Sequence, residues 1–258
     1  MIRNFKVLWQ LKLGTRLQGA VLATVLMLAS FFVSVVLPAP ALAQSNFSDD
    51  ALFDGFHRTV FGLEYDSGGR GASVVKKFSE PVRLYIDHRA RIDRRRAVTR
   101  FVRSVNQAVR GLDLRVVDNP LEANFTVYVV DRQQYAQVIQ DDVYNSSRAA
   151  VRGRCMVRVL TGNGGISQAQ AVIVSDEGDF LFNRCLVEEV LQGLGPLNDD
   201  PTLSASVFND SSQHARFMLH DRFVLNMLYH PRVQPGMSRD QVNSVLRTVL
   251  ADVRGHVR

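Results

Sequence analysis

Apolar residues recur at helical spacing between about residue 91 and residue 112, where they form one continuous stripe. A stripe with a period of about 3.6 residues is typical of a helix that packs on a core through one face. The pattern therefore predicts a helix over 91–112, the longest of the chain. Its apolar stripe consists of Val98, Phe101, Val102, Val105, Val109 and Leu112.

The opposite face of this predicted helix carries four arginines, which are Arg96, Arg100, Arg103 and Arg110. Charged side chains opposite an apolar stripe are typical of a helix surface that faces solvent. We therefore expect this face to be solvated. The alternative is that these arginines bind an anionic partner.

Five short stretches have the alternation or the apolar content of β-strands. They read PVRLYID (81–87), LRVV (114–117), FTVYVV (125–130), RCMVRVL (154–160) and AQAVIVS (169–175). The last two flank the turn sequence TGNGG and are expected to pair. Further helical patterns are at 132–140, 186–194 and 215–229, with a last helix from Ser238 onward. This order predicts an α+β domain with a mixed β-sheet packed on helices.

Local signals mark the ends of several elements. Ser238 starts the last helix, and Gln241 three residues later completes a capping box. A short helix is expected within 49–62 and a polar loop over 198–214. The glycine-rich stretch 66–74 lacks the GxGxxG order, so it is expected to be a connector and not a phosphate-binding loop. The buried face of the last helix is expected to consist of Val242, Val245, Leu246, Val249 and Val253.

The first 43 residues have the composition of a secretory signal peptide. An uncharged run from Gly19 to Leu37 is followed by an Ala-x-Ala cleavage site formed by Ala41 and Ala43. We expect cleavage after Ala43 and a periplasmic or secreted protein. The alternative is that the uncharged run stays uncut and anchors the protein in a membrane. The basic residues that precede the run are Arg3, Lys6, Lys12 and Arg16.

Cleavage divides the chain into a signal peptide (1–43), a flexible lead-in (44–52) and a single domain (53–258). Four of the 31 basic residues and none of the 25 acidic residues lie in the signal peptide, so the mature chain has a net charge of only +2. The whole-chain pI of about 9.7 therefore owes much to the signal peptide. This balance argues against a nucleic-acid partner, which requires an excess of basic residues.

Cys155 and Cys185 are the two cysteines of the chain. An even number of cysteines in an exported protein favours a disulfide, because the compartment outside the cytoplasm is oxidising. We therefore expect a Cys155–Cys185 bond, and two buried free thiols are the alternative. Two cysteines are too few for a structural zinc site.

Residues 185–199, CLVEEVLQGLGPLND, resemble the helix of HExxH zinc peptidases with both histidines replaced. In that motif two His ligands lie one helical turn apart, and a Glu next to the first acts as general base. Here Glu188 and Gln192 stand at the ligand positions and Glu189 stands at the base position. An ordinary amphipathic helix over 186–194 would have the same pattern. Its apolar face would consist of Val187, Val190, Leu191 and Leu194.

Several stretches together resemble one known family over about residues 53–240. They read FHRTVFGLEY, FSEPVRLYI, CLVEEVLQGLGPLND, SVFND and LNMLYHPRVQPGM. The family is domain of unknown function 2927, a group of exported proteobacterial proteins that is regarded as a distant relative of zincin metallopeptidases. The resemblance implies a zincin-like layout, in which a mixed sheet leads into the active-site helix, a glycine (Gly195) ends that helix and a turn with a methionine (Met237) follows. It brings no catalytic residues to carry over. Pro196 departs from the apolar residue usual after Leu-Gly and makes the helix end sharply.

These patterns predict a cleft lined by Glu188, Glu189, Gln192 and Asp199. Zinc is not expected there, because a carboxylate and an amide replace both imidazoles. Calcium held by oxygens of Glu188, Gln192 and Asp199 is a less favoured alternative. Without a metal the two adjacent glutamates repel each other, so at least one is expected to reach solvent or a positive partner. No pattern brings Asp200, His214 and His220 to the same place.

Three functions remain open at this stage. The favoured one is a non-catalytic relative of metallopeptidases that binds a peptide or a cell-envelope component, with no cofactor and no nucleic acid. The second is an active metal-dependent hydrolase that uses Glu189 as general base. The third is a purely structural envelope protein without a cleft.

Cleavage of the signal peptide is directly testable. The mature protein is expected to begin at Gln44 and to be recovered in the soluble fraction. N-terminal sequencing of protein isolated from the producing cell measures this start. A chain that retains residues 1–43 and partitions with membranes would instead identify the 19–37 run as an anchor.

Overall fold

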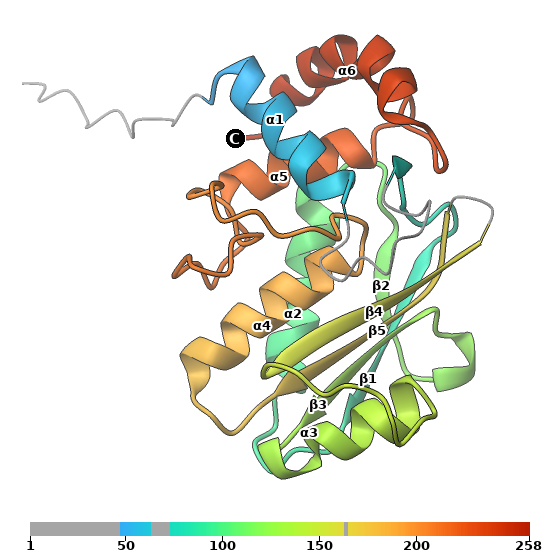
Figure 1. The fold of residues 1–258 in the computed structure, drawn as a ribbon, viewed down its shortest axis with the longest axis vertical. Helices are drawn as coiled ribbons and strands as arrows, with labels where there is room; N and C mark the ends of the chain where they lie inside the picture. The colour runs from blue at the N-terminus through green and yellow to red at the C-terminus, as the bar shows by residue number, and fades with distance from the viewer. Residues whose placement is uncertain (1–46, 63–72, 163–164) are drawn as a thin grey trace, which may run out of the picture. The chain divides into compact units, whose positions relative to one another are not determined.

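A computed structural model of the chain contains a five-stranded mixed sheet, with the strand order β2-β1-β3-β5-β4 (Figure 1). The structure describes residues 47–62, 73–162 and 165–258. The expected signal peptide and most of the glycine-rich connector 66–74 therefore lie outside the described residues. The strands are β1 (Val82–His88), β2 (Leu114–Val117), β3 (Phe125–Val130), β4 (Cys155–Gly162) and β5 (Gly165–Val174).

Four of these strands run parallel, and only β4 runs antiparallel to its neighbour β5. The central strand β3 is almost wholly buried, because helices cover both of its faces. Phe125, Val127 and Val129 point to one face, and the alternate residues Tyr128 and Val130 point to the other. The near-continuous apolar sequence FTVYVV is thus explained by two buried faces.

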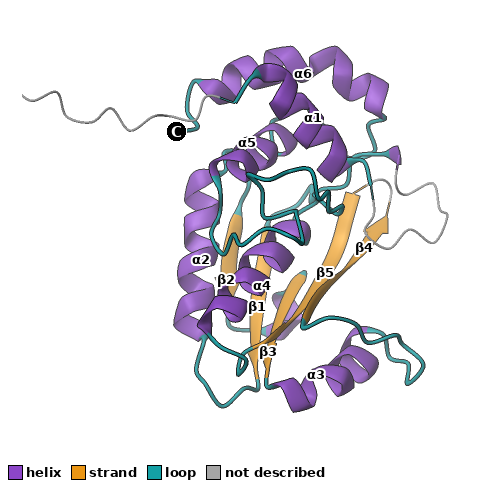
Figure 2. Cartoon of the chain, turned by 60° about the vertical axis from the view of Figure 1, so that its left-hand side comes forward, coloured by secondary structure: helices purple, strands orange, loops and turns teal. Residues whose placement is uncertain are grey.

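Two helices, α2 (Arg95–Ala108) and α4 (Asp179–Gln192), cover the face of the sheet that carries Phe125 and Val127. A shorter helix, α3 (Arg132–Val138), continues into a π-helical turn (Ile139–Val143) and covers the opposite face. Figure 2 shows α2 and α3 separated by the plane of the strands. The sheet therefore lies between two helical layers, and the expected α+β class with a mixed sheet is confirmed.

Three further helices pack together at one end of the sheet (Figure 1). They are α1 (Asp49–Val60), α5 (Leu219–Leu228) and α6 (Arg239–Arg254). The capping box predicted for the last helix is confirmed, since Ser238 Oγ accepts from Gln241 N at 3.3 Å and Gln241 Oε1 accepts from Ser238 N at 2.8 Å.

Several predicted helix boundaries were wrong, including the start of the helix expected over 215–229, which begins at Leu219. Among the described residues α6 is the longest helix with 16 residues, and α2 has only 14. The segment before α2 forms a loop because its side chains bind other segments, as Arg91 Nε does with Asp131 Oδ2 at 2.7 Å. Gly111, with φ of +83°, turns the chain after α2. Residues 49–52, which were expected to belong to the flexible lead-in, are helical, and Ser48 caps α1.

The predicted exposure of the arginine face of α2 is confirmed, and the apolar stripe is buried apart from the half-buried Phe101. The exposed arginines are Arg96, Arg100, Arg103 and Arg110.

The helix expected over 186–194 begins seven residues earlier, at Asp179, and ends at Gln192. An ion pair stabilises the first turn of α4, since Arg94 Nη1 lies 2.6 Å from Asp179 Oδ1. Beyond the helix, Gly195 has φ of +138°, and a Cβ there would lie 2.3 Å from the carbonyl oxygen of Lys76. Only glycine fits this turn, which explains why the chain leaves the helix near the predicted Leu-Gly pair.

The predicted disulfide between Cys155 and Cys185 is present. It joins the first residue of β4 to the middle of α4, and not to the start of the helix as the sequence pattern suggested. Such a bond is typical of a protein outside the reducing cytoplasm. No helix in the described ranges is both long and apolar enough to cross a membrane.

We predict that the double variant Cys155→Ala/Cys185→Ala folds but loses stability. The bond closes a loop with a sequence separation of 30 residues. Chain entropy gives such a loop about 3–4 kcal/mol of the free energy of unfolding. Urea denaturation measures the loss, and reduction of the wild-type protein should produce the same shift. An unchanged unfolding midpoint in both experiments would contradict the prediction.

Candidate functional site

Helix α4 carries polar side chains through the interior of the protein. Glu188 and Glu189 are each 5% exposed, and Gln192 is 2% exposed. Every residue from Cys185 to Gln192 is buried, which argues against the alternative of an ordinary amphipathic surface helix. Buried carboxylates are costly unless other groups balance their charge, so their surroundings indicate what the site can do.

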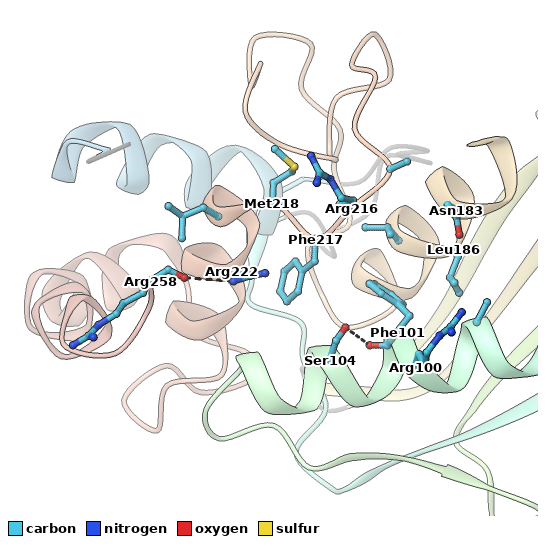
Figure 3. Close-up of a pocket in the computed structure, with 14 residues that line it drawn as sticks. Arg100, Phe101, Ser104, Asn183, Leu186, Arg216, Phe217, Met218, Arg222 and Arg258 are labelled. Carbon is cyan, nitrogen blue, oxygen red and sulfur yellow. Dashed lines mark hydrogen bonds between the residues drawn. The ribbon is translucent and has the colours of Figure 1, made fainter. Parts of the chain in front are cut away.

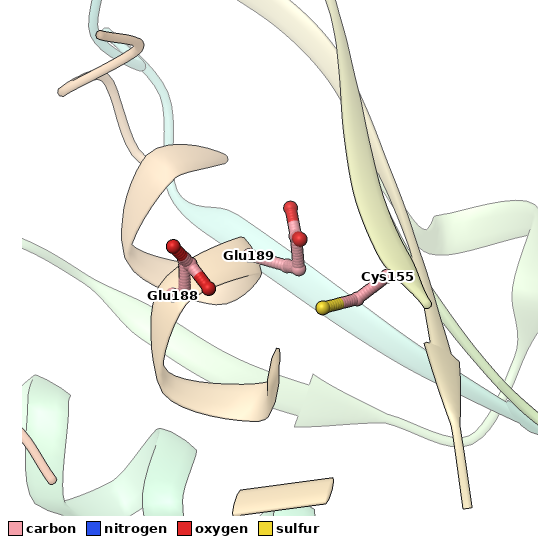
Figure 4. Close-up of side chains that lie close together, drawn as sticks. All are labelled: Cys155, Glu188 and Glu189. Atoms are coloured by element: carbon pink, nitrogen blue, oxygen red, sulfur yellow. The ribbon is translucent and has the colours of Figure 1, made fainter. Parts of the chain in front are cut away.

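These side chains line a cavity of about 270 Å³ between α4, the start of β4 and the loop after α4. We call it the α4–β4 cavity. It brings together all four residues that the sequence pattern selected. Figure 4 shows Glu188 and Glu189 on α4, with the side chain of Cys155 between Glu189 and β4. The lining consists of Gly153, Arg154, Cys155, Leu181, Arg184, Cys185, Glu188, Glu189, Gln192, Asp199 and Asp210.

Arg184 supplies the positive partner that a buried glutamate requires. Its Nη2 lies 3.2 Å from Glu188 Oε1 and 3.4 Å from Asp210 Oδ1. Its Nη1 also donates to the carbonyl oxygen of Ser212 at 3.1 Å. The guanidinium therefore balances carboxylates of the α4–β4 cavity and holds the loop after α4 against the helix.

A second polar contact joins the same helix and loop. Gln192 Nε2 donates to Asp199 Oδ1 at 2.9 Å. The neighbouring Asp200 points elsewhere and pairs with Arg58 of α1 at 3.0 Å. Hydrogen bonds from Thr202 and the Arg58 guanidinium lower the pKa of Asp200. Asp199 therefore belongs to the α4–β4 cavity, while Asp200 fixes the loop to α1.

Sequence reasoning missed Arg184 and Asp210. Arg184 lies four residues before Glu188, which is the spacing of an ion pair on one helix face. It was missed because the helix was expected to start after it. Nothing local marks Asp210, since the path of the loop brings it to the helix from 22 residues beyond Glu188.

The donors at the α4–β4 cavity do not fit zinc. All six histidines of the chain are described, and no group of metal-ligating side chains in the described ranges contains one. His214 Nε2 is hydrogen-bonded to Ser204 O at 2.7 Å, and His220 packs edge-on against Phe47. Cys155 is oxidised and cannot act as a thiolate. Protein zinc sites are dominated by imidazole and thiolate ligands, and neither is present in this cavity.

Carboxylate oxygens of Glu188, Asp199 and Asp210 lie within 4.8 Å of one another. Oxygens are the ligands that calcium prefers. However, the Arg184 guanidinium already contacts two of these three carboxylates. Gln192 directs its amide nitrogen, and not its oxygen, toward Asp199. The guanidinium of Arg184 therefore occupies the position next to these carboxylates that a calcium ion would need.

Strand β4 lies at the edge of the sheet beside this cavity. Just before β4, the carbonyl oxygen of Arg154 accepts a hydrogen bond from Val174 N of β5. In an antiparallel pair such bonds are made by every second residue, so the N–H and C=O groups of the residues between them point away from β5. These outward-pointing residues are Cys155, Val157 and Val159, whose side chains pack toward the core that contains α4. In the described ranges no backbone hydrogen bond from another segment reaches them. Such an edge can accept one more strand.

Residues 49–248 match the model of a family described as a protein of unknown function, DUF2927. The chain belongs to this family. The match confirms the family that the sequence resembled, and it begins at the first residue of α1. No curated protein matches the chain. The geometry of the DUF2927 domain is therefore the basis for assigning a function.

We predict that Arg184→Gln destabilises the DUF2927 domain by about 2–3 kcal/mol, because it removes the positive partner of a buried carboxylate. The double variant Arg184→Gln/Glu188→Gln should recover part of the loss, since the buried carboxylate that lost its arginine is then neutral. Arg103→Gln, at an exposed position on α2, is the control and should change stability by less than about 0.5 kcal/mol. Chemical denaturation measures all three. Equal stability of Arg184→Gln and the control would contradict this role for Arg184.

Proposed function

We propose that this DUF2927 protein is an exported, non-catalytic relative of zincin metallopeptidases that binds an extended peptide in the α4–β4 cavity. The observation that carries the proposal is that Cys155 belongs both to the outward-facing edge of β4 and to the lining of the cavity. A peptide paired with this edge would therefore pass directly over Glu188 and Glu189.

The outward-facing backbone edge of β4 supports the pairing of a peptide with this strand. Edge strands bind extended peptides by main-chain hydrogen bonds, while pockets beside the strand select side chains. The disulfide holds the start of β4 against α4, so the edge and the cavity keep a fixed distance. Binding to such a preorganised site loses less conformational entropy.

The charges of the cavity support a preference for a basic side chain. Its lining contains four acidic residues and two arginines. Arg184 contacts two of the acidic residues, and Arg154 lies 2.6 Å from Glu177, which is outside the lining. The lining thus has more acidic than basic side chains, and this excess favours a Lys or Arg side chain of the peptide.

The metallopeptidase relationship is supported by the layout of the domain. A mixed sheet precedes α4, glycines follow the helix at once, and Met237 lies in a turn further along the chain. The positions of the two ligands hold Glu188 and Gln192, which make polar contacts to Arg184 and Asp199. Export is supported by the disulfide and by the signal-like composition of residues 1–43.

An active hydrolase is the second candidate, because Glu189 lies in the cavity at the position of a general base. Loss of a general base typically lowers a rate by about 10²–10⁴-fold. Hydrolysis that is sensitive to chelator and disappears in Glu189→Gln would establish this candidate instead. A purely structural role receives less support, because it does not require a cavity beside Glu188 and Gln192.

We predict that peptides selected from a random array carry a basic residue and are recovered intact by mass spectrometry. Val157→Pro should weaken their binding at least about tenfold, because proline removes an outward-pointing N–H that the β4–β5 ladder does not use. Val157→Thr keeps this N–H and is the matched control. Circular dichroism and thermal melting verify that both variants fold. Wild-type affinity in a folded Val157→Pro variant, or cleaved peptides, would contradict the proposal.

A further inference from the structure

A second and larger cavity lies on the other side of α4 (Figure 3). It has a volume of about 600 Å³ and lies between α2, α4 and the segment 215–219 that leads into α5. We call it the arginine cavity. None of its lining residues belongs to the α4–β4 cavity. The two cavities are therefore separate sites on opposite sides of one buried helix.

The inner walls of the arginine cavity are apolar. Phe101 comes from α2, Leu186 comes from α4, and Phe217 and Met218 come from the segment before α5. Figure 3 shows the ring of Phe217 in the middle of this group. Phe101 and Phe217 are only partly buried, so they keep apolar surface open to a ligand. Apolar walls of this kind bind a hydrocarbon chain by removing its surface from water.

The charged side chains around these walls are all cationic. Arg100, Arg216 and Arg222 line the cavity, as does the exposed Arg258, and among the described residues no Asp or Glu side chain does so. In the part of the chain that the structure describes, no ion pair includes Arg100, Arg216 or Arg222. This differs from the ends of the strands, where Arg89 and Arg91 are paired with aspartates.

Arg222 has more hydrogen-bond donors in its guanidinium group than acceptors around it. Its Nη1 donates to the main-chain oxygen of Arg258 at 3.4 Å, and its guanidinium lies 5.7 Å from the centroid of the Phe217 ring. Its Nε is buried and has no hydrogen-bond partner among the described residues. A buried donor without a partner is unfavourable, so an anionic ligand would satisfy an existing need.

We propose that the arginine cavity binds a single acyl chain with an anionic head group, of the kind released from membrane lipids. The chain would lie along Phe101, Leu186 and Phe217. The head group would lie among the guanidinium groups of Arg100, Arg216 and Arg222. Small-molecule sites commonly have volumes of about 300–1,000 Å³ and combine apolar walls with a few charged groups. The inference does not depend on peptide binding at the α4–β4 cavity.

Isothermal titration calorimetry with decanoate and the purified protein tests this proposal. Decanoate is expected to bind saturably with one molecule per chain. The uncharged decanol, which has the same chain length, and inorganic phosphate, which has only the charge, should each bind at least about tenfold more weakly, because each lacks one half of the recognition. Equal binding of decanoate and decanol, or no saturable binding of decanoate, would overturn the proposal.

Variants locate the site. Arg100→Gln and Arg216→Gln remove exposed arginines that line the cavity, and at least one of them should weaken decanoate binding about tenfold. Arg110→Gln is the matched control, because it removes an equal charge near the end of α2 but lies outside the lining. Unchanged affinity in both cavity variants, or an equal loss in the control, would refute the site. Selective binding of an acidic peptide in place of decanoate would also refute it.

Discussion

The arrangement of this domain depends on the burial of α4, whose residues from Cys185 to Gln192 are all buried. A buried helix that carries two glutamates requires partners for its charges. Arg184 contacts Glu188, Asp210 and the carbonyl of Ser212, so the same interaction that balances a carboxylate also positions the loop after the helix. The disulfide from Cys185 to β4 fixes the helix on its other flank. The α4–β4 cavity exists because these two constraints hold helix, strand and loop around it.

The two sides of α4 have opposite electrostatic character. The cavity toward β4 has four acidic residues and two arginines, whereas the described lining of the arginine cavity toward α2 has only cations among its charged side chains. One helix thus separates a site suited to a basic peptide side chain from a site suited to an anionic amphiphile. Because the helix contributes residues to both sites, a shift of α4 at one cavity would change the shape of the other.

Local sequence patterns predicted the elements whose form depends on neighbouring residues in the chain. The apolar run of β3 identified a strand covered on both faces, and the Ser238–Gln241 capping box located the start of α6. The candidate residues Glu188, Glu189 and Gln192 of α4 were found by analogy with a metal-binding motif, and the structure places them in one cavity with the fourth candidate, Asp199. Their burial, the early start of α4 at Asp179 and the approach of Asp210 could not be predicted. All three features result from packing between segments that are distant in the sequence, and local sequence patterns carry no information about such packing.

We propose that, in a metallopeptidase-like layout, Arg184 and not a metal ion is the cation beside Glu188 and Asp210. Metal analysis of protein purified from its native compartment without chelator tests this claim most directly. We predict a zinc content far below one equivalent per chain, which added zinc and subsequent dialysis do not raise. One equivalent of zinc that survives dialysis, and that is lost in Glu188→Gln, would contradict the account.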